Sequence, residues 1–142
     1  MSAQASETRF IAEQLVKQLV GVPLPTARVA LLGSTFKADL PDMRNSGVVE
    51  LVAELEASGV DPIVHDPFAA PPDMRAGFGH RSVGARELYD LDMLVLAVKH
   101  HTCVRDLDGL LRNALKEGAV LVDLTGTTRR ADVPTTLRYW SL

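Results

Sequence analysis

The chain has 142 residues, 46% of them hydrophobic and 23% charged, with a net charge of −3 and an isoelectric point near 5.8. These values are typical of one globular domain that can bury a core without disulfides. They argue against nucleic acid as a partner, because that binding needs clustered positive charge. No apolar run approaches the roughly 20 residues of a membrane span, and Cys103 is the one cysteine. We therefore expect a cytoplasmic protein with no membrane contact.

The first expected element is a helix from about residue 7 to residue 20. Ser6 is placed to cap its start, and Gly21 is placed to end it. Its apolar positions recur at helical spacing and comprise Phe10, Ile11, Leu15, Val16, Leu19 and Val20. This broad apolar face must pack either on the rest of the chain or on a partner.

Unbroken apolar runs then alternate with amphipathic segments, which is typical of βαβ units and a parallel sheet buried on both faces. We expect strands at about 28–33, 60–65, 93–98 and 120–124, a short strand at 80–83, an edge strand at 137–142, and helices at 47–58, 85–89 and 104–116. The fold class is therefore α/β, a doubly wound, Rossmann-like sheet of about six strands in the order 3-2-1-4-5-6. Residues 1–25 form the lead-in helix, and residues 26–142 form the domain.

In such a sheet, ligands bind at the carboxyl ends of the strands where the strand order reverses. That places two segments at the crevice: the loop after Gly33 and residues 99–103. Lys99 and His100 directly follow the fourth strand, so we expect them to line the pocket.

The loop after the first strand, residues 34–46, exceeds the usual length of about 2–6 residues. It carries Lys37, Arg44 and the aromatic Phe36, and it leads into a helix N-terminus, which attracts phosphate. The loop therefore predicts a site for a nucleotide phosphate or diphosphate.

The glycine fingerprint G-x-G-x-x-G is absent, because Gly33 is followed by Ser34 and Thr35. This argues against the ordinary mode of NAD binding in this domain. Asp66, at the end of the second strand, either bonds a ribose or only forms a turn before Pro67.

Three segments stand in the order of a known pattern, G-x-x-F-K…D-x-R-x-S…[YH]-D-P. They are 33–37 (GSTFK), 42–46 (DMRNS) and 65–67 (HDP). The chain therefore resembles the C-terminal, UDP-binding domain of the UDP-glucose/GDP-mannose dehydrogenase family, from residue 28 to about residue 125. Segments 98–101 and 137–140 look most like the branch acting on UDP-N-acetylhexosamines or their uronates.

The resemblance implies that Phe36 and Lys37 help to hold the uridine nucleotide. It implies that Arg44 contacts the NAD phosphates, or the domain interface, in a complete enzyme. The alternatives are that Lys37 is solvated, that Phe36 caps the core, and that Arg44 pairs with Asp42 or Asp39.

A complete enzyme of this family oxidises the sugar C6 hydroxyl to a carboxylate with NAD. The resemblance does not extend to its N-terminal dinucleotide-binding domain or to its central domain with the nucleophilic cysteine. Cys103 lacks the flanking residues of that cysteine, so we expect no catalytic residue in these 142 residues. Many members also carry an Asp-Gly-Arg sequence after the fifth strand. Here 123–126 reads DLTG, and Arg129 and Arg130 follow.

His100, His101 and Cys103 suggest a metal cluster, but zinc needs three or four ligands in tetrahedral reach and no second group of His or Cys exists. We expect no metal. The favoured function is the UDP-sugar-binding part of an NAD-dependent nucleotide-sugar 6-dehydrogenase, inactive alone and not expected to bind NAD by itself. The alternatives are a stand-alone nucleotide-binding module and a non-catalytic subunit whose lead-in helix docks on a catalytic chain or on a second copy.

Overall fold

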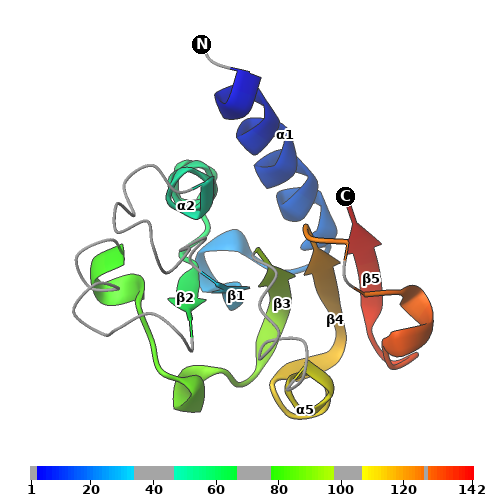
Figure 1. Cartoon of the computed structure of the whole chain (residues 1–142). Helices are drawn as coiled ribbons and strands as arrows, with labels where there is room; N and C mark the ends of the chain where they lie inside the picture. Colours follow the sequence, from blue (N-terminus) through cyan, green and yellow to red (C-terminus); the bar gives the residue numbers. More distant parts are fainter. Residues whose placement is uncertain (1–2, 34–46, 67–77, 98–106, 127) are drawn as a thin grey trace, which may run out of the picture.

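The computed structural model describes residues 3–33, 47–66, 78–97, 107–126 and 128–142. They form one sheet of five parallel strands in the order β2-β1-β3-β4-β5 (Figure 1). The strands are β1 (Val29–Leu32), β2 (Ile63–His65), β3 (Leu91–Leu96), β4 (Leu115–Asp123) and β5 (Arg138–Ser141). The helices are α1 (Ala3–Gln18), α2 (Gly47–Ala57) and α5 (Leu107–Asn113), with short 3₁₀ turns η1 (Leu24–Thr26), η3 (Gly79–Arg81), η4 (Ala85–Glu87) and η5 (Arg130–Asp132).

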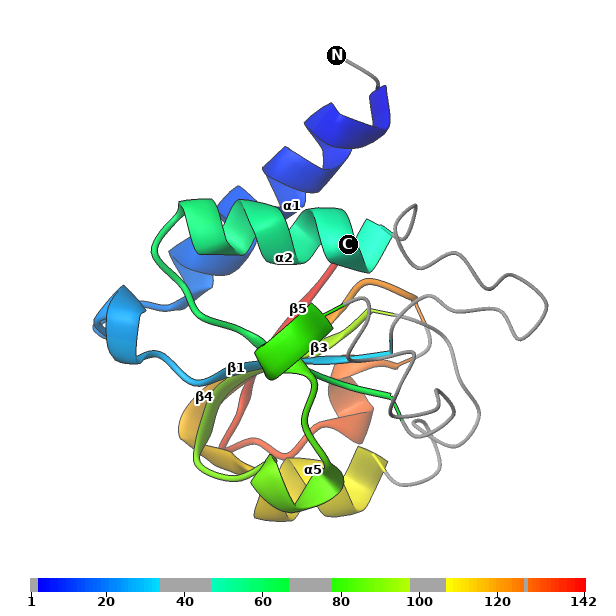
Figure 2. The ribbon, with the colours of Figure 1, turned by 90° about the vertical axis from the view of Figure 1, so that its left-hand side faces the viewer.

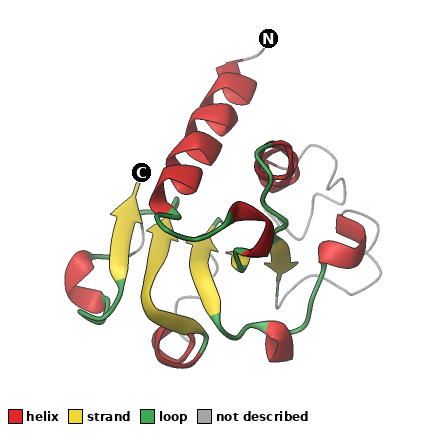
Figure 3. Cartoon of the chain, turned by 180° about the vertical axis from the view of Figure 1, so that it is seen from behind, coloured by secondary structure: helices red, strands yellow, loops and turns green. Residues whose placement is uncertain are grey.

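Helices cover both faces of the sheet. Helices α1 and α2 lie side by side on one face, and α5 lies on the other (Figures 1 and 2). The view from behind shows the same three layers (Figure 3). This arrangement confirms the expected doubly wound α/β fold with an N-terminal helix.

The expected third strand, at 80–83, is reduced to one parallel bridge between Val64 of β2 and Ser82. The 3₁₀ turn η3 takes up the residues before the bridge, so too few remain for a strand. Arg81 holds this turn against the end of α2 through ion pairs with Asp61 and with Glu56, the latter at 3.0 Å. Because Ser82 lies on the outer side of β2, the expected order 3-2-1-4-5-6 holds, with its third member a single residue pair.

The start of β4 differs from the prediction. The sequence predicts a helix to about residue 116 and a strand from residue 120, whereas α5 ends at Asn113 and β4 begins at Leu115. Leu115 pairs with Leu91 of β3, and the Leu91 amide donates to the Ala114 carbonyl at 2.9 Å. Pairing with β3 therefore overrides the helical spacing of the leucines. Residues 116–118 are exposed, which hides this part of the strand from a search for apolar runs.

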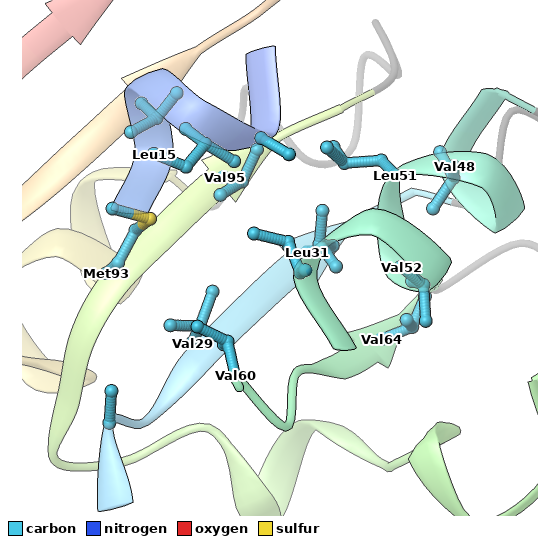
Figure 4. Packing of buried hydrophobic residues seen from close by; sticks show 14 of the residues in the cluster. Leu15, Val29, Leu31, Val48, Leu51, Val52, Val60, Val64, Met93 and Val95 are labelled. Carbon is cyan, nitrogen blue, oxygen red and sulfur yellow. The ribbon is translucent and has the colours of Figure 1, made fainter. Parts of the chain in front are cut away.

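Side chains alternate between two cores along every central strand. One core, beneath α1 and α2, is shown in Figure 4 and contains Val29, Leu31, Val64, Met93, Val95, Val120 and Val122 from the sheet. The other core, above α5, contains Ala30, Leu32, Leu94, Leu96 and Leu121. Both faces of the strands are therefore buried, as their unbroken apolar runs predict.

Helix α1 is part of the domain's own core. Leu15 is completely buried against the sheet, and Ala12 and Leu19 are 2% and 5% exposed. At its C-terminus, Arg138 Nη2 of β5 donates to the Gln18 carbonyl at 2.7 Å, which satisfies a carbonyl that the helix leaves open. The helix begins at Ala3, so Ser6 lies inside it and the prediction that Ser6 caps its start is wrong. Of the helices the structure describes, none is both long and apolar enough to cross a membrane.

Candidate functional site

The carboxyl ends of the strands meet in register at one edge of the sheet. Leu32 pairs with His65 on one side and Leu96 on the other, Leu96 pairs with Asp123, and Asp123 pairs with Ser141. Beyond the strands, the Gly33 amide donates to the His65 carbonyl at 2.8 Å and the Ala97 amide donates to the Leu32 carbonyl at 3.1 Å. The strand order reverses at β1, between β2 and β3, so the crevice of a doubly wound sheet falls at this edge.

Gly33 marks the point where the chain leaves β1. Its φ of 93° lies in the left-handed region, which glycine adopts without steric cost and other residues rarely adopt. Gly33 ends β1 and Ala97 follows β3, so the segments 34–46 and 98–106 begin at neighbouring places on the carboxyl edge. Neighbouring strands are about 4.8 Å apart.

All five predicted site residues lie in those two segments, outside the described residues: Phe36, Lys37 and Arg44 in the first, Lys99 and His100 in the second. The alternative partners Asp39 and Asp42 lie there too. In the described part of the chain, Gly33 and Ala97, which precede these two segments, lie at the ends of the neighbouring strands β1 and β3. The roles of the five side chains stay predictions.

Asp66 follows β2 at the same edge. It is 6% exposed and has an interaction partner. Beside it, the imidazole Nδ1 of His65 donates to the Val83 carbonyl at 3.0 Å, because a carbonyl oxygen can only accept. The choice between a ribose contact and a turn for Asp66 stays a prediction.

The most elaborate polar arrangement at this edge surrounds Asp123, at the end of β4. Its side chain is fully buried. Oδ1 accepts from the Thr125 amide at 2.8 Å, the Thr125 hydroxyl at 2.6 Å and the Gly126 amide at 3.1 Å. Oδ2 accepts from the Thr128 amide at 2.8 Å and the Thr128 hydroxyl at 2.5 Å. The carboxylate therefore fixes the turn that follows β4 through five hydrogen bonds.

These contacts decide the charge state of Asp123. Burial alone would raise the pKa of the carboxyl, because it disfavours the charged form. The hydrogen bonds from Thr125 and Thr128 outweigh burial and lower the pKa of Asp123 below its ordinary value. Asp123 is therefore an anion at neutral pH, held by neutral donors.

Two arginines follow this turn and differ in what they contact. Arg130 donates to the carbonyls of Val133, Pro134 and Leu137 at 3.0 to 3.4 Å, so it braces the connection to β5. Arg129 is exposed, and among the described residues its guanidinium makes no hydrogen bond or ion pair. Of the two, Arg129 is the one available to a ligand.

The described residues include clefts elsewhere, of which one, of about 340 Å³, lies between α5 and the start of β5. Its Arg112 and Lys116 already pair with Asp108 and Asp92, at 3.2 and 3.3 Å. The carboxyl edge is therefore the better candidate for a phosphate-binding site than this cleft. His100, His101 and Cys103 lie outside the described residues. Within the described ranges, no three His, Cys, Asp or Glu side chains are grouped to hold a metal ion.

Comparison with known proteins decides the family. A model described as the UDP binding domain of the UDP-glucose/GDP-mannose dehydrogenase family matches residues 30–130, which is most of the sheet and both segments at its carboxyl edge. The chain belongs to this family. The resemblance seen in the three motif segments is thereby confirmed.

Curated relatives match the chain over much of its length. Protein CapL of Staphylococcus aureus is 28% identical over 136 residues, which are 94% of this chain and 32% of that protein. UDP-N-acetyl-D-glucosamine 6-dehydrogenase of Pseudomonas aeruginosa is 36% identical over 93 residues, which are 64% of this chain and 22% of that protein. The chain thus spans about a third or less of these relatives' length.

Solved structures give the same result. A UDP-glucose dehydrogenase from Pyrobaculum islandicum matches with a TM-score of 0.63 and 26% identity, over 95% of this chain and 29% of that one. A UDP-D-ManNAc dehydrogenase from Pyrococcus horikoshii matches with a TM-score of 0.68 and 16% identity, over 94% and 30%. The second likeness shows the fold alone. In both cases the match covers under a third of the enzyme.

The hydrogen bonds around Asp123 are not predicted by the sequence analysis. The signal was an Asp at a strand end followed by Thr at the second and fifth positions, Thr125 and Thr128. Asp side chains commonly bond the backbone two residues ahead, so the pattern predicts a carboxylate-centred turn. Residues 123–126 also differ from the Asp-Gly-Arg sequence, which draws attention away from this pattern.

Proposed function

We propose that this chain binds the uridine diphosphate end of a UDP-sugar at the carboxyl edge of its sheet, as part of an NAD-dependent nucleotide-sugar 6-dehydrogenase. The observation that carries the proposal is the family match over residues 30–130, which includes the predicted contacts Phe36, Lys37, Lys99 and His100. The geometry supports it, because the two segments holding these residues start from adjacent strand ends, β1 and β3.

The phosphate end needs positive charge. Lys37 and Arg129 are the cations that we assign to the nucleotide phosphates, and Arg44 is assigned to the NAD phosphates of a complete enzyme. Arg129 takes the place of the arginine that many family members carry after the fifth strand. The supporting observation is that Arg130 is engaged with three backbone carbonyls and Arg129 is not.

The oxidation itself belongs to parts of the enzyme beyond these residues. We expect the chain alone to oxidise no UDP-sugar and to bind no NAD, because the glycine fingerprint is absent after β1. Its contribution is to hold the nucleotide so that the sugar is positioned for chemistry elsewhere. The sugar class we favour is the N-acetylhexosamine, because two relatives carry the name UDP-N-acetyl-D-glucosamine 6-dehydrogenase.

Calorimetric titration of the purified chain with UDP tests the proposal, with ADP and NAD as competing ligands. We expect UDP to bind, ADP to bind at least tenfold more weakly, NAD not to bind, and Lys37→Ala to remove most of the UDP affinity. Lys17→Ala is the matched control, because it also removes one lysine, but from the exposed end of α1 beside the start of β5. Absence of UDP binding at millimolar concentration would refute a uridine site on this chain.

The alternative of a non-catalytic subunit docking through its lead-in helix is less well supported. The apolar face of α1 packs against the chain's own sheet, where Leu15 is fully buried. Phe10 and Val20 are large apolar residues that stay exposed on or just after this helix, and these two do not form a broad apolar face. We retain UDP binding as the function.

A further inference from the structure

We propose that Asp123 is a positioning residue for nucleotide binding. Its carboxylate, together with Tyr139 of β5, holds the turn after β4 as a fixed wall of the crevice. This inference rests on the proposed function, since it names how one wall of the same site is held in place.

The burial of the Asp123 carboxylate has a free-energy cost that the hydrogen bonds of the turn must offset. Asp123 is a fully buried anion, and the described residues offer it no cation within ion-pairing distance. Burying a charge without a counterion is expensive unless hydrogen bonds compensate for lost water. Among the described residues, five donors compensate, all from residues 125, 126 and 128, and three of them are backbone amides. If Thr125, Gly126 or Thr128 moved away, the buried carboxylate would lose donors that compensate for the lost water.

The turn after β4 lies at the same edge of the sheet as the predicted site. Asp123 pairs with Leu96, and Leu96 pairs with Leu32, so the turn lies two strands from the end of β1 on the same edge. Two strand spacings are roughly 10 Å, which is within the reach of a nucleoside diphosphate that starts at the β1–β3 crevice. The turn also leads directly into Arg129, which is exposed and whose guanidinium makes no hydrogen bond or ion pair with the described part of the chain.

Strand β5, near the C-terminus, also contacts the turn after β4. The Tyr139 hydroxyl donates to the Thr128 carbonyl at 3.0 Å and lies 3.1 Å from the Thr128 hydroxyl, which itself donates to Asp123. The Leu142 amide donates to the Asp123 carbonyl at 3.1 Å. The turn is therefore held from inside by Asp123 and from the edge of the sheet by β5.

The test compares UDP affinity with stability in four proteins: the unsubstituted chain, Asp123→Asn, Tyr139→Phe and Asp92→Asn. Asp92 is the matched control because it is also a buried carboxylate, 9% exposed, but it lies at the amino end of the sheet, bound to the Arg28 amide and Lys116. Titrations with UDP are made where circular dichroism shows each protein folded. We expect Asp123→Asn to weaken UDP binding tenfold or more, by analogy with the large effects of small misplacements. We expect Tyr139→Phe to weaken it severalfold and Asp92→Asn to leave it unchanged.

Each outcome decides the inference. Unchanged UDP affinity in folded Asp123→Asn overturns it, and so does an equal loss in Asp92→Asn, because the effect would then be one of general stability. If Asp123→Asn does not fold, Tyr139→Phe decides, and unchanged affinity there overturns the inference. Failure of the unsubstituted chain to bind UDP refutes the proposed function as well, whereas binding that tolerates both substitutions refutes only the role of Asp123.

Discussion

Replacing Asp123 by Asn should destabilise the fold strongly, because the substitution turns an acceptor into a donor inside a ring of donors. The Thr125 and Gly126 amides both point at Oδ1, so the Asn oxygen must take that place and its NH₂ must take the place of Oδ2. There the NH₂ meets the Thr128 amide, 2.8 Å from the present oxygen. One buried N–H then has no acceptor, and the bonds to the other oxygen lose their charge.

An unsatisfied buried donor costs about 1–3 kcal/mol, and each bond to a neutral acceptor is weaker by about 1 kcal/mol than one to a charged acceptor. The relief of burying a charge offsets part of this sum. We therefore expect the free energy of unfolding to fall by about 2–4 kcal/mol at pH 7. Asp92→Asn should cost about 1 kcal/mol or less, because Asn keeps the bond from the Arg28 amide and loses only an ion pair with Lys116, whose side chain is 47% exposed.

Urea unfolding followed by circular dichroism measures both values, and the pH dependence adds a second check. The pKa of Asp123 is lowered in the folded state, so its stabilising effect is complete above its ordinary pKa of about 3.9 and is lost as pH falls through the lowered value. The difference between the unsubstituted chain and Asp123→Asn should be constant from pH 7 to pH 5 and shrink only in strong acid. A cost below about 1 kcal/mol, or a difference that changes between pH 7 and pH 5, would refute this reasoning.

Three further predictions test the packing. Leu15→Ala should lower the free energy of unfolding in urea by about 2–5 kcal/mol, because it empties a fully buried position in α1. Phe10→Ala, at a site 51% exposed, should change it by no more than about 0.5 kcal/mol. Equal effects would mean that α1 is not packed on the sheet. Gly59→Ala should destabilise the fold by about 1–2 kcal/mol, because the φ of Gly59 is +98°. Gly109→Ala, in α5 with open space around it, should stabilise the fold by about 0.5–1 kcal/mol. A stabilising Gly59→Ala or a destabilising Gly109→Ala in thermal melts would contradict these backbone conformations. Arg138→Met should lower stability by about 1–2 kcal/mol through loss of its bonds to the carbonyls at the end of α1 and in β4, and hydrogen exchange should quicken first at the end of α1; unchanged exchange there would argue against this clamp.

The central architecture was predictable because its signals are strong and local. Leu94 and Leu121 lie in apolar runs that are typical of a strand buried on both faces, and Gly59 follows α2 in a left-handed conformation that favours glycine. The third strand was overpredicted. Ser82 makes one bridge, because a turn precedes it and Gly84 follows it.

Other features depend on contacts that no local pattern encodes. The early start of β4 rests on Leu115 meeting Leu91, 24 positions away in the chain, which overrides a helical repeat. The Asp123 turn leaves a local trace, but its closure depends on Tyr139 reaching Thr128 from β5. For the site, the motif segments sufficed to identify the family. The topology then places the starts of segments 34–46 and 98–106 at neighbouring strand ends, and the contacts of Lys37 and its neighbours stay predictions.

The most direct test of the account is a UDP titration of the isotope-labelled chain followed by amide resonances. If UDP binds at the carboxyl edge, the resonances that move belong to that edge, including Gly33, Ala97 and Gly126, while those at the amino edge, such as Arg28 and Asp92, stay in place. Shifts confined to the amino edge, or no shifts at millimolar UDP, would contradict a nucleotide site at the carboxyl ends of β1, β3 and β4.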